Sequence, residues 1–236
     1  MREMVSRSRL EHALAAQGLR LRGGFVPVAA DALPGLPGSA SAAVVWLVGQ
    51  VGSELWPHFS AASFLHDGLP DPLDRWSKSI GMALAETEGG CAIFPSDGPP
   101  WYPFQQWASR AEPVGPSPLQ LLIHPEYGLW HAYRFALVLP LLHPDDAAAL
   151  APAVRRAATD VCARCDGQPC LQACPVQAFT GTRYRVDDCA GHLHGPAGAD
   201  CKQGGCLARR ACPVGTELRY VPEHAAFHMA AFAQRH

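Results

Sequence analysis

The spacing of apolar residues predicts three elements in the amino-terminal part of the chain. Residues 2–17 carry apolar side chains at helical spacing and are followed by Gly18, which predicts a first helix. Residues 41–48 form a continuous valine-containing apolar run, which is typical of a buried strand. Residues 71–88 repeat apolar positions every three or four residues before Gly89, which predicts an amphipathic helix.

A β-hairpin is predicted over residues 119–140. Two apolar runs flank the sequence HPEYG, in which Pro125 takes the position that proline favours in a turn and Gly128 ends the turn. Alternation in the second strand places Trp130 and Arg134 on the same face. Because a buried arginine needs a partner, we expect Arg134 to pair with a carboxylate or to contact an anionic part of a ligand.

Three other segments carry further predictions, and two of them leave more than one interpretation open. Residues 145–160 are rich in alanine, with acidic residues first and arginines last, and they predict a helix. Residues 222–234 predict a short helix on which His224 and His228 lie one turn apart, as structural residues or as a pair of metal ligands. The aromatic residues of segment 101–107 belong either to the core or to a pocket for a flat ligand.

Length and composition limit the class of protein. A chain of 236 residues with 48% hydrophobic residues can form one medium domain or two small ones. Its longest apolar run, residues 135–142, is far shorter than the roughly 20 residues that span a bilayer. Residues 1–152 contain nine Lys/Arg against fourteen Asp/Glu, and residues 153–236 contain ten against seven. We therefore expect neither a membrane segment nor the basic surface that nucleic-acid binding requires.

Eight of the nine cysteines lie between Cys162 and Cys212 and carry the strongest chemical signal in the sequence. Two segments, CDGQPCLQACPV and CKQGGCLARRACPV, repeat a cysteine followed by Cys-Leu and then Ala-Cys-Pro-Val. In bacterial proteins with paired 4Fe-4S clusters, the proline-linked fourth cysteine binds the other cluster. Crosswise ligation predicts one cluster on Cys162, Cys165, Cys170 and Cys212, and another on Cys174, Cys189, Cys201 and Cys206.

Disulfides and structural zinc are the two alternative uses of these cysteines. Disulfides suit secreted proteins, but residues 1–18 are charged and lack the long apolar stretch of a signal peptide. We therefore expect reduced thiols and a cytoplasmic location. Zinc typically binds two CxxC pairs, whereas this segment combines one CxxC with two Cys-Pro motifs. Two 4Fe-4S clusters are the expected cofactors.

Two motifs resemble known families. The cysteine segment, with VDDC at residues 186–189 between two Cys-Pro motifs, resembles the cluster domain of epoxyqueuosine reductase and of reductive dehalogenases. In those enzymes two clusters pass electrons to a cobalamin. The sequence IHPEYGLWHAYR at residues 123–134 resembles the cobalamin-binding segment of the CblC-type processing protein (MMACHC), in which an aromatic-Gly-x-Trp motif contacts the corrin. The resemblance implies cobalamin contacts at Tyr127, Gly128, Leu129 and Trp130.

These resemblances imply an α+β protein with two domains. Residues 1–152 are expected to form a nitroreductase-like domain of sheet and helices that binds cobalamin, with Arg134 at the corrin rim. Residues 153–236 are expected to form a bacterial-ferredoxin-like domain with two 4Fe-4S clusters. The general acid is not identified, because both Glu112 and Glu126 lie near the hairpin.

The expected function is that of an iron-sulfur oxidoreductase. It would pass electrons from an external low-potential donor through the clusters to cobalamin, either to process the cobalamin or to reduce a small molecule. Two alternatives remain open. One is a ferredoxin-type electron-transfer protein without a corrin, and the other is a tRNA-modifying enzyme similar to epoxyqueuosine reductase. The charge distribution argues against the second alternative.

Overall fold

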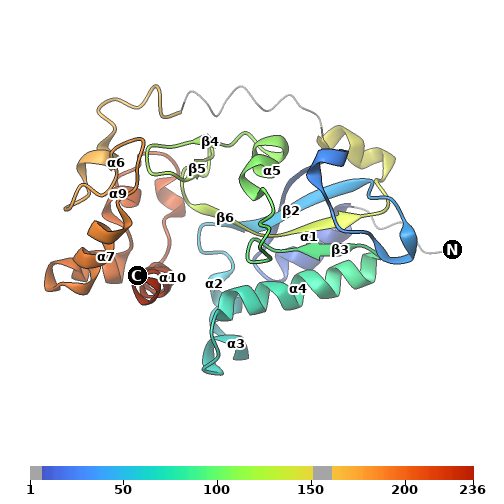
Figure 1. Ribbon diagram of the computed structural model, residues 1–236, viewed down its shortest axis with the longest axis horizontal. Coiled ribbons are helices and arrows are strands. Elements are labelled where there is room, and N and C mark those ends of the chain that lie inside the picture. The colour runs from blue at the N-terminus through green and yellow to red at the C-terminus, as the bar shows by residue number, and fades with distance from the viewer. Residues whose placement is uncertain (1–6, 151–160) are drawn as a thin grey trace. The chain divides into compact units, whose positions relative to one another are not determined.

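The computed structural model describes residues 7–150 and 161–236, which form an α+β protein with two compact units (Figure 1). Unit 1 comprises Met1–Glu112 and Ala132–Arg155, and unit 2 comprises Pro113–His131 and Arg156–His236. This division differs from the single boundary expected at residue 152. Segment 113–131 groups with the cysteine-rich part of the chain because its apolar side chains share a core with that part.

Unit 1 contains a four-stranded sheet with the strand order β1-β2-β6-β3. Strand β1 (Arg20–Phe25) is antiparallel to β2 (Val44–Val51), and β3 (Cys91–Ile93) is antiparallel to β6 (His131–Leu139). All eight residues of β2 are buried, as expected for a central strand between β1 and β6. The strand predicted from the apolar run over residues 41–48 is confirmed, although it begins three residues later.

Helices pack on this sheet. Helix α4 (Pro72–Glu88) runs beside β3 and confirms the predicted amphipathic helix (Figure 1). Its buried residues recur at helical spacing: Leu73, Trp76, Ser77, Gly81 and Ala85. Gly89 ends the helix with a φ of 67°, a conformation that glycine adopts without strain. Helices α1 (Arg7–Ala15) and α5 (Phe104–Ala111) pack against β1.

The remaining helices of unit 1 are short. They are η1 (Ala29–Asp31), η2 (Pro37–Ser39), α2 (Trp56–Ser60), α3 (Ser63–His66) and η3 (Pro144–Leu150), where η denotes a 3-10 helix. The helix expected over residues 145–160 is therefore a 3-10 helix in its described part. Its last residues, 151–160, lie outside the described residues.

The aromatic segment after β3 belongs mainly to the core of unit 1. Trp107 is 1% exposed, and its ring lies 5.7 Å from that of Tyr102 and 5.2 Å from that of Phe104. Its indole N–H donates a hydrogen bond to Asp31 at 3.1 Å, which satisfies the polar end of a buried tryptophan. Trp101 is the exception, because 65% of it is exposed.

Unit 2 combines a small antiparallel sheet with short helices. The sheet consists of β4 (Gly115–Pro116) and β5 (Leu122–Ile123). The helices are α6 (Pro169–Gln172), α7 (Val186–His194), η5 (Pro196–Gly198), α8 (Ala199–Gly204), α9 (Leu207–Arg210), η6 (Thr216–Leu218) and α10 (Pro222–Arg235). Helix α10 confirms the predicted terminal helix and packs against α8. None of the described helices has both the length and the apolar character needed to cross a bilayer.

The predicted hairpin forms differently from the expectation. Its first strand, β5, pairs with β4, whereas its second strand, β6, joins the sheet with β2 and β3. The turn between them is closed by two hydrogen bonds of 2.9 Å exchanged between the backbones of His124 and Gly128. The two strands separate because Ile123 is buried in the core of unit 2, while residues 135–139 are buried in unit 1.

Candidate functional site

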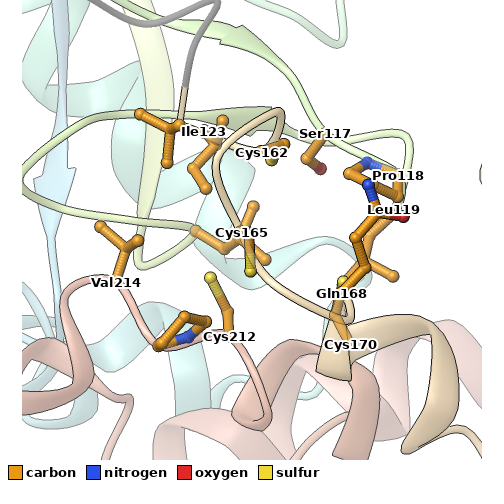
Figure 2. A pocket seen from close by; sticks show the side chains of 13 residues that line it. Ser117, Pro118, Leu119, Ile123, Cys162, Cys165, Gln168, Cys170, Cys212 and Val214 are labelled. Carbon is orange, nitrogen blue, oxygen red and sulfur yellow. The ribbon is translucent and has the colours of Figure 1, made fainter.

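Four of the predicted cluster ligands line one pocket in unit 2 (Figure 2). Cys162 and Cys165 precede α6, Cys170 lies within α6, and Cys212 follows α9. Figure 2 shows the side chains of Cys165 and Cys212 pointing toward one another. The pocket has an empty volume of about 360 Å³, part of which is open to solvent. Residues that are about fifty positions apart in the sequence thus meet around one space.

The surroundings of this pocket are mainly apolar. Leu119, Ile123 and Leu129 line it and are each at most 3% exposed. Burial, followed by the nearby thiols of Cys212, Cys170 and Cys165, raises the pKa of Cys162 to about 11. A thiolate at Cys162 is therefore disfavoured unless a nearby positive charge compensates it, which is a condition that a metal cluster would satisfy.

The other four predicted ligands also lie within electrostatic range of one another. Burial raises the pKa of Cys189, and the charges of Cys174 and Cys201 raise it further. Burial is also the main cause that raises the pKa of Cys206 to about 11, with further contributions from Cys201 and Cys189. The assignment of the eight cysteines to two cluster-binding sets therefore stays a prediction.

Hydrogen bonds to sulfur accompany this second set. The backbone N–H of Ala178 donates to Cys174 Sγ at 3.3 Å. The hydroxyl of Tyr184 donates to Cys189, and burial, followed by this hydrogen bond, raises the pKa of Tyr184. Such donors stabilise negative charge on sulfur, which is what cysteine ligands of an iron-sulfur cluster require.

The cysteines do not converge on a single ion. In the part of the chain that the structure describes, no three His, Cys, Asp or Glu side chains surround one metal position. A tetrahedral zinc site brings its thiolates within about 2.3 Å of one ion, whereas a 4Fe-4S cluster has four irons for its four cysteines. Metal analysis of the protein is therefore the direct test of either occupant.

The aromatic-Gly-x-Trp motif is packed inside unit 2. The ring of Tyr127 stacks on His124 at 4.1 Å, and Leu129 is part of the same core as Cys174 and Cys212. Gly128 has a φ of 56°, and a Cβ atom added to it would lie 2.1 Å from the carbonyl oxygen of Val214. The glycine is therefore required by close packing against Val214, whatever else the segment contacts.

Trp130 is buried against Tyr220 and Arg209. It is 3% exposed and packs edge-on against Tyr220 with ring centroids 5.5 Å apart. The guanidinium of Arg209 lies 4.6 Å from the Trp130 ring and 4.4 Å from the Tyr220 ring, and its Nε donates to the Leu129 carbonyl at 3.1 Å. Cation-π contacts of this kind fix the segment before α10 to the motif.

Arg134 belongs to unit 1, unlike the four residues of the motif. Its Nε donates a hydrogen bond of 2.8 Å to the side-chain oxygen of Gln50. This described partner is a neutral amide.

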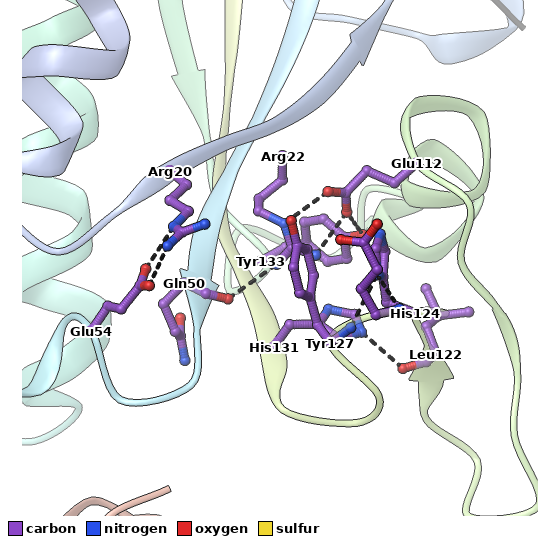
Figure 3. Close-up of polar contacts among 11 residues, drawn as sticks. Arg20, Arg22, Gln50, Glu54, Glu112, Leu122, His124, Tyr127, His131 and Tyr133 are labelled. Atoms are coloured by element: carbon purple, nitrogen blue, oxygen red, sulfur yellow. Dashed lines mark hydrogen bonds and ion pairs between the residues drawn. The ribbon is translucent and has the colours of Figure 1, made fainter. Parts of the chain in front are cut away.

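A buried polar cluster in unit 1 was not predicted (Figure 3). Arg22, 2% exposed, donates to both carboxylate oxygens of Glu112 at 2.8 and 2.9 Å, and also to the Gln50 carbonyl at 3.0 Å. The Tyr133 hydroxyl donates to Glu112 at 2.5 Å. Burial raises the pKa of Glu112 although Arg22 opposes the shift, and burial followed by the Glu112 charge raises that of Tyr133. Of the two acids considered from the sequence, Glu112 lies in this cluster with a side chain that is 11% exposed, and Glu126 is exposed.

Comparison with known proteins adds a likeness of fold. Neither a protein-family model nor a curated protein sequence matches this chain. Among solved structures, the chain is similar to a cobalamin-trafficking protein of animals. That protein is C. elegans CblC, described as a B12-trafficking protein and a homologue of human MMACHC. The likeness covers 96% of this chain and 94% of CblC, with 14% sequence identity and a TM-score of 0.51, and it therefore concerns the fold.

We expect Arg22→Met to lower the free energy of unfolding by about 3–5 kcal/mol at neutral pH, because it leaves the buried Glu112 carboxylate without its cation. The pKa of folded Glu112 is already raised. Protonated Glu112 therefore contributes stability that is fully present below the ordinary pKa of a glutamate. That stability is lost as pH rises through the raised pKa of Glu112 in the folded protein. The penalty in the variant should shrink toward about pH 4. Urea unfolding across this pH range measures it.

Arg20→Met is the matched control for that experiment. Arg20 lies in the same strand and pairs with Glu54 at 2.7 Å, but the two side chains are 50% and 35% exposed. An exposed pair of this kind contributes about 1 kcal/mol or less. Equal losses in the Arg20 and Arg22 variants, or a loss in Arg22→Met that does not depend on pH, would contradict the expectation.

We expect Gly128→Val to lower the free energy of unfolding of unit 2 by about 1–3 kcal/mol or more. The valine side chain would overlap the Val214 carbonyl, and the backbone at residue 128 must keep a positive φ. Thermal unfolding followed by circular dichroism measures the loss. Gly191→Ala in α7 is the control, because an added Cβ there meets open space. Unchanged melting of Gly128→Val would show that the Val214 contact is not required.

Proposed function

We propose that the protein is an iron-sulfur oxidoreductase that passes electrons from an external low-potential donor to a bound cobalamin. The observation that carries this proposal is the meeting of Cys162, Cys165, Cys170 and Cys212 around one largely apolar pocket. These four cysteines would hold one 4Fe-4S cluster. Cys174, Cys189, Cys201 and Cys206 would hold the second, in a ferredoxin-like arrangement within unit 2.

The cysteine environments suit electron transfer. A bound 4Fe-4S cluster takes up and releases one electron, at potentials between roughly -700 and +450 mV that depend on hydrogen bonds and solvent exposure. Here burial disfavours net negative charge, and donors such as the Tyr184 hydroxyl offset that effect. The residues of unit 2 therefore supply both the ligands and the means to adjust the potential.

Cobalamin as the electron acceptor is supported by the fold. The solved structure to which the chain is similar is that of a B12-trafficking protein, and the likeness extends over nearly the whole chain. Of the five expected corrin contacts, Tyr127 and Arg134 are half-buried and keep exposed surface with which a ligand can interact. Cobalamin would be either a substrate that is reduced during processing or a cofactor for the reduction of a small molecule.

A second candidate is a ferredoxin-type electron-transfer protein without a corrin. It is favoured by the burial of Gly128, Leu129 and Trp130, because packing within unit 2 explains these residues without a ligand. The two candidates share the clusters and differ only in the acceptor. Cobalamin binding therefore discriminates between them.

The cluster assignment predicts the effect of Cys212→Ser. Anaerobically reconstituted wild type should contain about eight iron and eight sulfide, and the variant should lose the cluster held by Cys162, Cys165 and Cys170. Iron and sulfide analysis with electron paramagnetic resonance measures both. Cys91→Ser is the control, because Cys91 lies in strand β3 of unit 1 and should leave the iron content unchanged. Stoichiometric zinc, or loss of only the other cluster, would overturn the assignment.

The proposed acceptor predicts saturable binding of hydroxocobalamin to cluster-loaded protein, measured by equilibrium dialysis. Reduced wild type should then reduce the bound cobalamin. Cys212→Ser should still bind it but reduce it at least tenfold more slowly, because one cluster of the electron path is missing, and Cys91→Ser should behave as wild type. Folded, cluster-loaded wild type that binds no cobalamin would exclude this acceptor and favour the ferredoxin-type function.

A further inference from the structure

A serine side chain shares the pocket with the four cysteines. Ser117 is 7% exposed and lies among the lining residues together with Cys162, Cys165, Cys170 and Cys212 (Figure 2). Its hydroxyl oxygen is buried and, within the described residues, has no hydrogen-bond partner. A buried hydroxyl without a partner lowers stability, and folded proteins rarely keep such a group unless it has a role or a partner from outside the chain.

The backbone around Ser117 is already satisfied. Ser117 follows β4, its N–H donates to the Leu121 carbonyl at 2.9 Å, and its carbonyl accepts from the Gln120 N–H at 3.0 Å. Pro118 restricts the backbone of Ser117 to extended conformations. The turn therefore holds the residue in place, and the side-chain hydroxyl is the group that this local structure leaves without a partner.

Few of the other side chains that line the pocket can form a hydrogen bond with this hydroxyl. Apart from the cysteines, the described lining residues are apolar except for Ser117 and Gln168. The side chains of Leu119, Ile123 and Leu129 exclude water from one side of the pocket. In such surroundings a hydrogen bond to a charged acceptor is stronger than it would be in water.

We propose that the Ser117 hydroxyl donates a hydrogen bond to a sulfur atom of the cluster held by these four cysteines and thereby raises its reduction potential. The inference rests on the proposed function, because it requires a cluster in the pocket. The reduced cluster carries one more negative charge than the oxidised cluster. A donor at sulfur therefore stabilises the reduced form more, which makes the potential less negative.

The experiment is a redox titration of reconstituted full-length protein monitored by electron paramagnetic resonance. The signal that Cys212→Ser lacks identifies the cluster in question. Ser117→Ala should shift the midpoint potential of that cluster to a more negative value, and Ser117→Thr, which keeps the hydroxyl, should restore it. Ser77→Ala is the matched control. It removes a serine that is 1% exposed and bonded to the Leu73 carbonyl in α4, so the potential should stay unchanged.

Each outcome decides the inference. A cluster in Ser117→Ala with the wild-type potential overturns it. If Ser117→Ala assembles no such cluster, Ser117→Thr decides: assembly with the wild-type potential supports the hydroxyl contact, and failure assigns Ser117 to packing alone. Wild type that takes up no iron would instead overturn the proposed function itself, a result that iron analysis distinguishes before any titration.

Discussion

Apolar packing of residues 113–131 onto the cysteine-bearing loops is the constraint on which unit 2 depends. Leu119, Ile123 and Leu129 share a buried core with Cys174 and Cys212. The loops that carry the cysteines contain only short helices. Here a segment from the middle of the chain supplies apolar surface to the cysteine loops and holds them against a common core.

This constraint changes the interpretation of the aromatic-Gly-x-Trp motif. Gly128 is needed because the Val214 carbonyl approaches its backbone, and Trp130 is held between Arg209 and Tyr220. A motif that resembles a corrin-binding segment therefore has a packing role in this chain. Packing within unit 2 accounts for Gly128, Leu129 and Trp130, the buried members of the motif.

Unit 1 is organised around a different interaction. Arg22 and Glu112 form a bidentate ion pair, and the Tyr133 hydroxyl donates a further hydrogen bond to Glu112. These contacts link strand β1, the residue that follows helix α5, and strand β6. Desolvation makes such a pair a weak source of stability, but an unpaired member would be strongly destabilising. The pair therefore favours the one arrangement of these three elements in which both charges are satisfied.

The sequence by itself determined the features that depend on local spacing. The central strand β2 follows from a continuous apolar run, and helix α4 with its terminal Gly89 follows from the periodicity of apolar residues. Helix α10 was also predicted from the sequence. The repeated Cys-Pro motifs likewise predict two sets of cysteine ligands, and that assignment stays a prediction.

Only the tertiary structure decided which distant residues meet. It pairs β5 with β4 instead of β6, joins Arg22 to Glu112 across 90 positions, and brings Ser117 to the cysteine pocket. The pattern of a strand shows that one face is buried but contains no information about which strand or core will cover it. Those choices are made by the packing of the whole chain, where each apolar face is buried against the surface that fits it.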